Sequence, residues 1–105
     1  MIETVGIVGL GLIGGSIAKA ARQYTDCTLL GYDTDGAVLS RALDEGVLSA
    51  ALTPDRLPEC GLVIIALYPE ATVEYVTAHR DRFRRGGIVM DCGGVKGVVC
   101  GPLED

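Results

Sequence analysis

TVGIVGLGLIGGS, residues 4–16, is the stretch of sequence that decides the fold. A short apolar run at residues 5–8 leads straight into a Gly-x-Gly-x-x-Gly pattern formed by Gly9, Gly11 and Gly14. Apolar residues with helical spacing follow at once, at Ile13, Ile17, Ala20, Ala21 and Tyr24. A strand, a glycine turn and a helix in this order form the context in which a dinucleotide-binding fingerprint occurs.

Each glycine of this pattern has a separate predicted role. Gly9 allows the tight turn after the strand, Gly11 lets a pyrophosphate approach the backbone, and Gly14 lets the helix pack closely on the strand. The helix start, at Leu12 and Ile13, presents unpaired N–H groups and the positive end of the helix dipole to the phosphates. We therefore assign these five residues to a cofactor-binding turn.

An acidic residue at the end of the next strand strengthens this interpretation. Such a second signal is needed because glycine makes up 15 of the 105 residues, so the glycine pattern alone could arise by chance. Asp33 lies 33 − 14 = 19 residues after Gly14, near the expected spacing of about 20. A carboxylate there accepts hydrogen bonds from adenosine ribose hydroxyls and repels a 2′-phosphate, which predicts NAD as the cofactor. The alternative is that Asp33 only caps the following helix.

The composition and charge of the chain indicate which kinds of protein it can be. The chain has 105 residues, 49% hydrophobic and 22% charged, which predicts one globular domain spanning residues 1–105. Its net charge of −5 argues against a nucleic-acid partner. No apolar run approaches the roughly 18 residues needed to span a membrane. The chain opens directly into its first strand, so we expect no signal peptide and a cytoplasmic location.

The four cysteines, Cys27, Cys60, Cys92 and Cys100, form no C-x-x-C pair and no metal-ligand spacing. We expect buried thiols in a reducing compartment and no metal site.

The rest of the chain alternates strand and helix patterns. Strands are expected at residues 5–8, 27–32, 62–67 and 88–91, with a doubtful edge strand at 47–49. Helices are expected at residues 12–24, from Asp35 to a stop at Gly46, and at residues 70–85. The second helix is expected to face the core with Val38, Leu39, Ala42 and Leu43, and the third with Val73, Val76 and Phe83. Residues 52–60 are expected to form a loop with one helical turn. Alternation of this kind predicts an α/β fold, a Rossmann-type open parallel sheet with helices on both faces.

In such a sheet, ligands bind beyond the carboxyl ends of the strands. We therefore expect the nicotinamide ribose to pass between Leu67, Tyr68 and Pro69 at one strand end and Cys92 and Gly93 at another. Four arginines crowd the end of the third helix, at positions 80, 82, 84 and 85. An anion site and a solvated helix end are both possible interpretations, and the second is favoured because cations suit a helix C-terminus. His79, among them, is expected to be exposed.

Three segments resemble the prephenate and arogenate dehydrogenases: GLGLIGGSIA at residues 9–18, VIIALYP at 63–69, and DCGGVK at 91–96, which is similar to the family's D-x-G-S-x-K segment. The resemblance implies a dehydrogenase that uses NAD to oxidise prephenate, or its amino analogue arogenate. The substrate loses a hydride to the nicotinamide and loses carbon dioxide as its ring aromatises, on the route to tyrosine. In the family a histidine acts on the ring hydroxyl, and the serine of D-x-G-S-x-K helps to hold that hydroxyl.

The chain departs from this family pattern at two places. Gly94 stands at the serine position, and no histidine-proline motif follows Lys96, while His79 does not match. We therefore identify no catalytic residue, and assign only Gly94 and Lys96 to the substrate side. Lys96 would attract the substrate's carboxylates, or is simply an exposed residue at a helix start. The family's helical dimerisation domain has no counterpart here, which favours a fragment of a longer enzyme over a natural protein without a catalytic half, and predicts that these residues alone are inactive.

Two alternatives to this function stay open. The first is a module that binds a dinucleotide without turning it over. The second is the cofactor domain of another hydride-transfer enzyme with a helical second domain, of a pyrroline carboxylate or hydroxyacid type. Within the resembled family, the sequence leaves the choice between prephenate and arogenate open.

Overall fold

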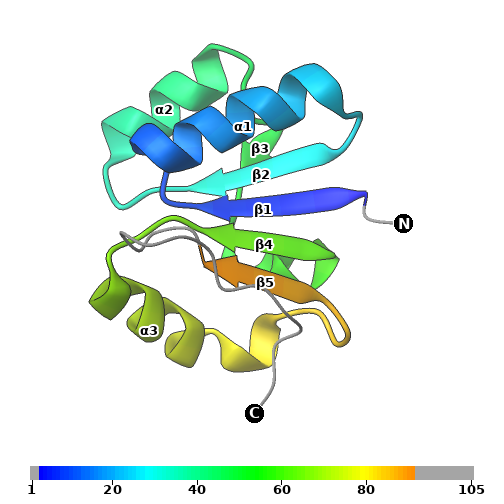
Figure 1. Ribbon diagram of the computed structural model, residues 1–105, viewed down its shortest axis with the longest axis vertical. Helices are drawn as coiled ribbons and strands as arrows, with labels where there is room; N and C mark the ends of the chain where they lie inside the picture. The colour runs from blue at the N-terminus through cyan, green and yellow to red at the C-terminus, as the bar shows by residue number, and fades with distance from the viewer. Residues whose placement is uncertain (1–2, 92–105) are drawn as a thin grey trace.

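The computed structural model describes residues 3–91, which form a five-stranded parallel sheet with helices on both faces (Figure 1). The strands are β1 (Thr4–Val8), β2 (Thr28–Tyr32), β3 (Ala50–Ala51), β4 (Leu62–Ile65) and β5 (Ile88–Asp91). The helices are α1 (Leu12–Tyr24), α2 (Gly36–Asp44) and α3 (Pro69–Ala78), with 3₁₀ turns η1 (Pro54–Glu59) and η2 (Arg80–Arg82). This confirms the predicted α/β class and the Rossmann-type arrangement.

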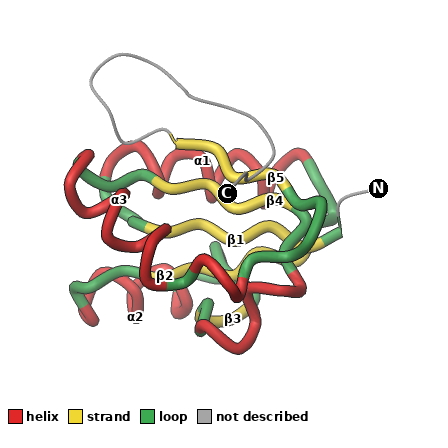
Figure 2. Tube along the Cα trace, turned by 90° about the horizontal axis from the view of Figure 1, so that it is seen from below, coloured by secondary structure: helices red, strands yellow, loops and turns green. Residues whose placement is uncertain are grey.

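The strand order is β3-β2-β1-β4-β5 (Figure 2). Every neighbouring pair of strands is parallel. The chain starts in the middle of the sheet, builds outward through β2 and β3, and then crosses back to add β4 beside β1. All strands point the same way, so the loops that lead into α1, α2 and α3 gather at one edge of the sheet (Figure 1). The order in which strands are added to the sheet reverses between β1 and β4. Sheets of this kind bind ligands in the crevice that forms at such a reversal.

The core has two halves, one on each face of the sheet. Consecutive strand residues alternate between them: Leu29 belongs to the cluster beneath α1 and α2, and Leu30 belongs to the cluster beneath η1 and α3. Ile64 and Ile65 divide in the same way. The central strands are therefore apolar on both sides, as a parallel sheet covered by helices requires.

α2 begins and ends where the sequence predicts. Its N-cap is Asp35, whose Oδ1 accepts a hydrogen bond of 3.0 Å from the backbone N–H of Ala37. Gly46, just past its C-terminus, has a φ of +75°, a conformation that favours glycine. The predicted inner residues Val38, Leu39, Ala42 and Leu43 pack against the first core cluster.

α1 has the predicted bounds, but its buried side is narrower than its apolar repeat indicates. Gly14 and Ala18 are buried, and Ile17 and Ala21 pack against the core. Ile13 is 50% exposed and Tyr24 is 77% exposed. The helix lies so close to the sheet that only small side chains fit along its centre, which turns the larger ones outward.

The prediction for the third helix is wrong in the length of the helix and at one of its three inward residues, Val73. α3 ends at Ala78 rather than at residue 85, and the chain continues through η2 so that Phe83 packs into the second core cluster. Val73 is 64% exposed, whereas Thr72 is buried and donates its hydroxyl to the carbonyl of Leu67 at 3.3 Å. Val76 packs against the core as predicted.

Two smaller predictions also differ. The edge strand forms at Ala50–Ala51 instead of residues 47–49, because its backbone pairs with Leu30 and Gly31 while Leu48 is buried in the core. β4 ends at Ile65, two residues earlier than predicted. The single helical turn expected in residues 52–60 is present as η1.

Cys60 is buried, and burial raises the pKa of its thiol to about 11, so it is a protonated, unreactive core residue at neutral pH. Cys27 is half-buried, and Cys92 and Cys100 lie outside the described residues. Within residues 3–91 no three His, Cys, Asp or Glu side chains come together as a metal site would require. Over the same span, no helix has the length and apolar character to cross a membrane.

Candidate functional site

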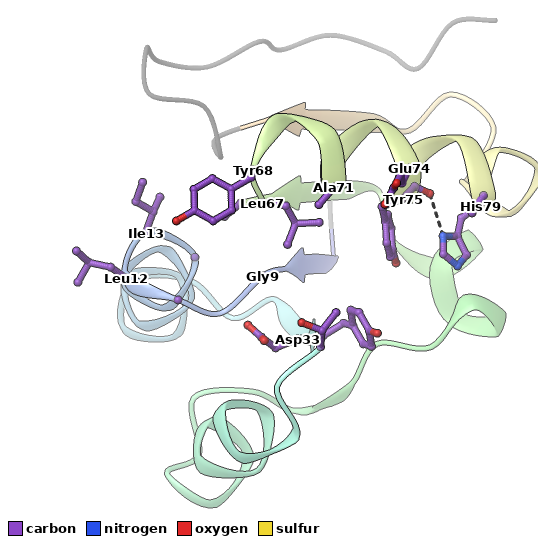
Figure 3. A pocket seen from close by; sticks show the side chains of 16 residues that line it. Gly9, Leu12, Ile13, Asp33, Leu67, Tyr68, Ala71, Glu74, Tyr75 and His79 are labelled. Carbon is purple, nitrogen blue, oxygen red and sulfur yellow. Dashed lines mark hydrogen bonds between the residues drawn. The ribbon is translucent and has the colours of Figure 1, made fainter.

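A cleft of about 710 Å³ lies at the carboxyl ends of β1, β2 and β4, between the start of α1 and one side of α3 (Figure 3). Eight of the predicted cofactor residues line it: Gly9, Gly11, Leu12, Ile13, Gly14, Asp33, Leu67 and Tyr68. Residues from three separate segments of the sequence therefore meet at the edge of the sheet where ligands of this fold bind.

The glycine turn has the steric properties predicted for its three glycines. Gly9 has a φ of +94°, and a Cβ there would collide with the carbonyl oxygen of Ala66. A Cβ on Gly14 would collide with the carbonyl oxygen of Gly9 and lie 3.3 Å from the Cβ of Ala66. At Gly11, by contrast, a Cβ would meet nothing within 4 Å. Two glycines are required by the fold itself, and the third leaves open space on the cleft side.

The N-terminus of α1 opens into that space. Gly11 is the N-cap and supplies no side chain to the first-turn N–H groups, and that turn carries no acidic residue. Helix N-termini without such partners have unpaired donors and a partial positive charge, which suits an anion. The side chains of Leu12, 89% exposed, and Ile13 stand at this end of the cleft (Figure 3).

Asp33 follows β2 and faces the same cleft, but its carboxylate already has two partners. Oδ2 accepts a hydrogen bond of 2.7 Å from the backbone N–H of Leu10, and Oδ1 accepts one of 2.8 Å from the N–H of Asp35. The cap of α2 is the side chain of Asp35, not that of Asp33. Each carboxylate oxygen retains acceptor capacity, so a ribose hydroxyl can still bind there.

The wall formed by α3 is the part of the cleft that the sequence analysis missed. It consists of Ala71, Glu74, Tyr75, Ala78 and His79, joined on the opposite side by Tyr32 and Thr34. The four α3 positions and the C-cap His79 are spaced three or four residues apart, as the residues of one helix face are. That spacing was visible in the sequence, but a mixture of small, charged and aromatic residues carries no hydrophobic signal.

Aromatic rings concentrate at the far end of this wall (Figure 3). The rings of Tyr75 and His79 have centroids 4.3 Å apart, and Tyr32 lies 6.3 Å from Tyr75. Nδ1 of His79 is 2.9 Å from the carbonyl oxygen of Tyr75, so it carries the proton in that bond. Burial raises the pKa of Tyr75 to about 12, and its phenol is neutral at physiological pH. The prediction that His79 is exposed is wrong: it is half-buried against Tyr75.

Several predicted residues are not part of the described cleft. Pro69 is the first residue of α3 and is exposed. Cys92, Gly93, Gly94 and Lys96 lie outside the described residues. The arginines at positions 80, 82, 84 and 85 are exposed and do not line the cleft; Arg82 forms an ion pair of 2.9 Å with Asp55. That arrangement agrees with a solvated chain segment rather than a ligand site.

Comparison with known proteins identifies the family. Residues 17–105 match a family model described as the nucleotide-binding domain of prephenate dehydrogenase. The chain is also 33% identical over 108 aligned positions to a cyclohexadienyl dehydrogenase of Zymomonas mobilis, an alignment that covers 100% of this chain and 37% of that protein. The chain thus spans about a third of the length of this curated relative.

Solved structures give the same result. A prephenate dehydrogenase from A. aeolicus, crystallised with hydroxyphenyl propionate and NAD⁺, superposes with a TM-score of 0.75 at 26% identity, over 92% of this chain and 35% of that one. An arogenate dehydrogenase from Synechocystis superposes with a TM-score of 0.77 at 21% identity, over 84% of this chain and 32% of that one, and supports the fold. With its fold, its glycine turn and its sequence match in agreement, the chain belongs to the family of prephenate dehydrogenase nucleotide-binding domains.

Proposed function

We propose that residues 1–105 form one dinucleotide-binding domain and that the cleft binds NAD. The observation that carries this proposal is the glycine turn: Gly9 and Gly14 bring the backbone together, while Gly11 leaves space against the uncapped start of α1. Asp33 lies in the same cleft. The A. aeolicus prephenate dehydrogenase that superposes on this chain was crystallised with NAD⁺.

The shape of the cleft suggests how the cofactor lies. Its pyrophosphate contacts the N–H groups at the start of α1, and its adenosine ribose contacts Asp33. The adenine ring extends along α3 toward Tyr75, where small and aromatic side chains offer a flat apolar wall. The nicotinamide ribose passes beside Leu67 and Tyr68 toward the segment that contains Cys92 and Gly93. From Tyr68 to His79 the wall extends roughly 16 Å, which separates His79 from the nicotinamide end.

For the whole protein we propose an oxidoreductase of tyrosine biosynthesis. Prephenate or arogenate would transfer a hydride to NAD and release carbon dioxide as the ring aromatises, with its hydroxyl proton going to a base. Gly94 and Lys96 would lie on the substrate side, and a helical dimerisation domain would complete the active site. We propose a cytoplasmic enzyme whose partners are small molecules rather than nucleic acid or membrane. The support is the family match and the dehydrogenase relatives.

Cofactor preference tests the nucleotide proposal. We expect the chain to bind NAD about tenfold or more tightly than NADP, because the carboxylate of Asp33 would face the 2′-phosphate and the neighbouring Thr34 and Asp35 add no cation. Isothermal titration of the 105-residue chain with each cofactor measures the ratio. Equal or tighter binding of NADP would contradict the assignment of Asp33, and failure to bind either would contradict the function.

Catalysis should be absent from these residues alone. Positioning of the two reactants supplies roughly 7–11 kcal/mol of such a barrier, and the described cleft forms one wall of the space that a substrate would need. A positioned base contributes about 10²–10⁴-fold more. We expect no NADH formation with prephenate or arogenate at saturating NAD, followed by absorbance. Turnover near the usual enzyme range of about 1–10³ per second would show that a base is present within Met1 to Asp105.

A further inference from the structure

Two consecutive N–H groups of the glycine turn are held by two consecutive residues at the end of β2. The N–H of Gly9 donates to the carbonyl oxygen of Tyr32 at 2.7 Å, and the N–H of Leu10 donates to Oδ2 of Asp33 at 2.7 Å. The first contact uses only backbone atoms. The second depends on a side chain 23 residues further along the chain, so it can be removed by substitution.

This contact lies where a structural partner is needed. Leu10 is 6% exposed, and its side chain packs into the first core cluster, so its N–H has little access to water. A buried N–H without an acceptor is unfavourable, and a carboxylate is a stronger acceptor than a neutral group. Leu10 also stands between Gly9, with its φ of +94°, and Gly11, the N-cap of α1. The hydrogen bond of its N–H therefore anchors the residue that joins Gly9 to Gly11.

The other carboxylate oxygen of Asp33 binds the turn before α2. Oδ1 accepts from the N–H of Asp35, the N-cap of α2, so one carboxylate joins the turn before α1 to the turn before α2. A role as ribose acceptor alone would not require these two bonds.

We propose that Asp33 is a positioning residue for the phosphate turn: its carboxylate holds Leu10 so that the N–H groups from Gly11 onward face the pyrophosphate. This inference rests on the proposed NAD-binding function. It differs from ribose recognition because it predicts that Asp33 affects ligands that have no ribose. It also predicts that a change of cofactor preference made at position 33 weakens binding of NAD and NADP alike.

Inorganic pyrophosphate separates the two roles, since it has phosphates and no ribose. Asp33→Ala and Asp35→Ala each remove one negative charge and truncate the side chain to a methyl group, two residues apart. Coulomb's law alone predicts that both variants bind pyrophosphate as well as the parent or better. If Asp33 positions the turn, Asp33→Ala should instead bind pyrophosphate more weakly, with an affinity about tenfold lower than that of Asp35→Ala. Asp33→Asn, which keeps one acceptor oxygen, should recover part of the loss.

The measurements are made by NMR on the 105-residue chain. Amide shifts report pyrophosphate affinity, and hydrogen exchange in the ligand-free chain reports the Leu10 N–H, expected to exchange on the order of tenfold to a hundredfold faster in Asp33→Ala only. Thermal unfolding confirms that both variants are folded. If Asp33→Ala binds pyrophosphate as tightly as Asp35→Ala, the positioning role is overturned. A parent chain that binds pyrophosphate but not NAD would instead contradict the proposed function, and the pair of variants would still decide the role of Asp33.

Discussion

Gly14→Ala is expected to destabilise the fold by about 3 kcal/mol or more. The added Cβ would collide with the carbonyl oxygen of Gly9 and would lie 3.3 Å from the Cβ of Ala66. Neither neighbour is the flexible end of a side chain. The turn at Gly9 is held to β2 by its hydrogen bond to Tyr32, and Ala66 donates its N–H to Val8 at 2.7 Å. Relief of the collision would therefore require α1 to move away from the sheet.

The measurement is thermal unfolding, in which a loss of this size lowers Tm by roughly 10–20 °C for a domain of about 100 residues. Gly36→Ala is the matched control. Gly36 is the first residue of α2, and a Cβ there would meet nothing within 4 Å. Alanine is the better helix former, so this variant should be as stable as the parent or slightly more stable. A Tm for Gly14→Ala within two or three degrees of the parent would mean that α1 does not pack against the turn as described.

Gly11→Val should abolish NAD binding and leave the fold in place. No atom lies within 4 Å of the Cβ position at Gly11, and the φ of −70° there is open to any residue. Valine is a poorer N-cap than glycine, which costs a few tenths to about 1 kcal/mol. Its branched side chain would fill the space proposed for the pyrophosphate and cover the first N–H groups of α1. Loss of two charge-assisted hydrogen bonds predicts a fall in affinity of about a hundredfold or more.

Titration of NAD into the variant, with circular dichroism to confirm folding, measures this effect. Gly36→Ala again serves as control and should bind NAD like the parent, since Gly36 does not line the cleft and a Cβ there would meet nothing within 4 Å. NAD affinity of Gly11→Val equal to that of the parent would show that the cofactor does not lie against the glycine turn. Gly11→Val and Gly14→Ala together separate function from stability within three residues of one motif.

Local rules were sufficient for the elements that the sequence predicted correctly. The glycine turn, the cap at Asp35 and the stop at Gly46 depend on φ angles and on hydrogen bonds to nearby residues, which residue type alone constrains. Likewise, β4 is apolar on both faces because it lies in the middle of the sheet. These features predict that the glycine turn and Asp33 lie at the same end of the sheet, and both line the cleft there.

Contacts between segments far apart in the sequence decided the features that the sequence did not predict. The inner face of α3 is set by Thr72 and Tyr75 rather than Val73, because helical periodicity gives the spacing of a face and not its rotation when apolar residues occur all round. The cleft wall from Ala71 to His79 follows from that rotation. The carboxylate of Asp33 meets Leu10 only because β1 and β2 are neighbours. Steric limits on single residues can be read from sequence, whereas the partner of a side chain depends on which strands pair and which helix face is buried.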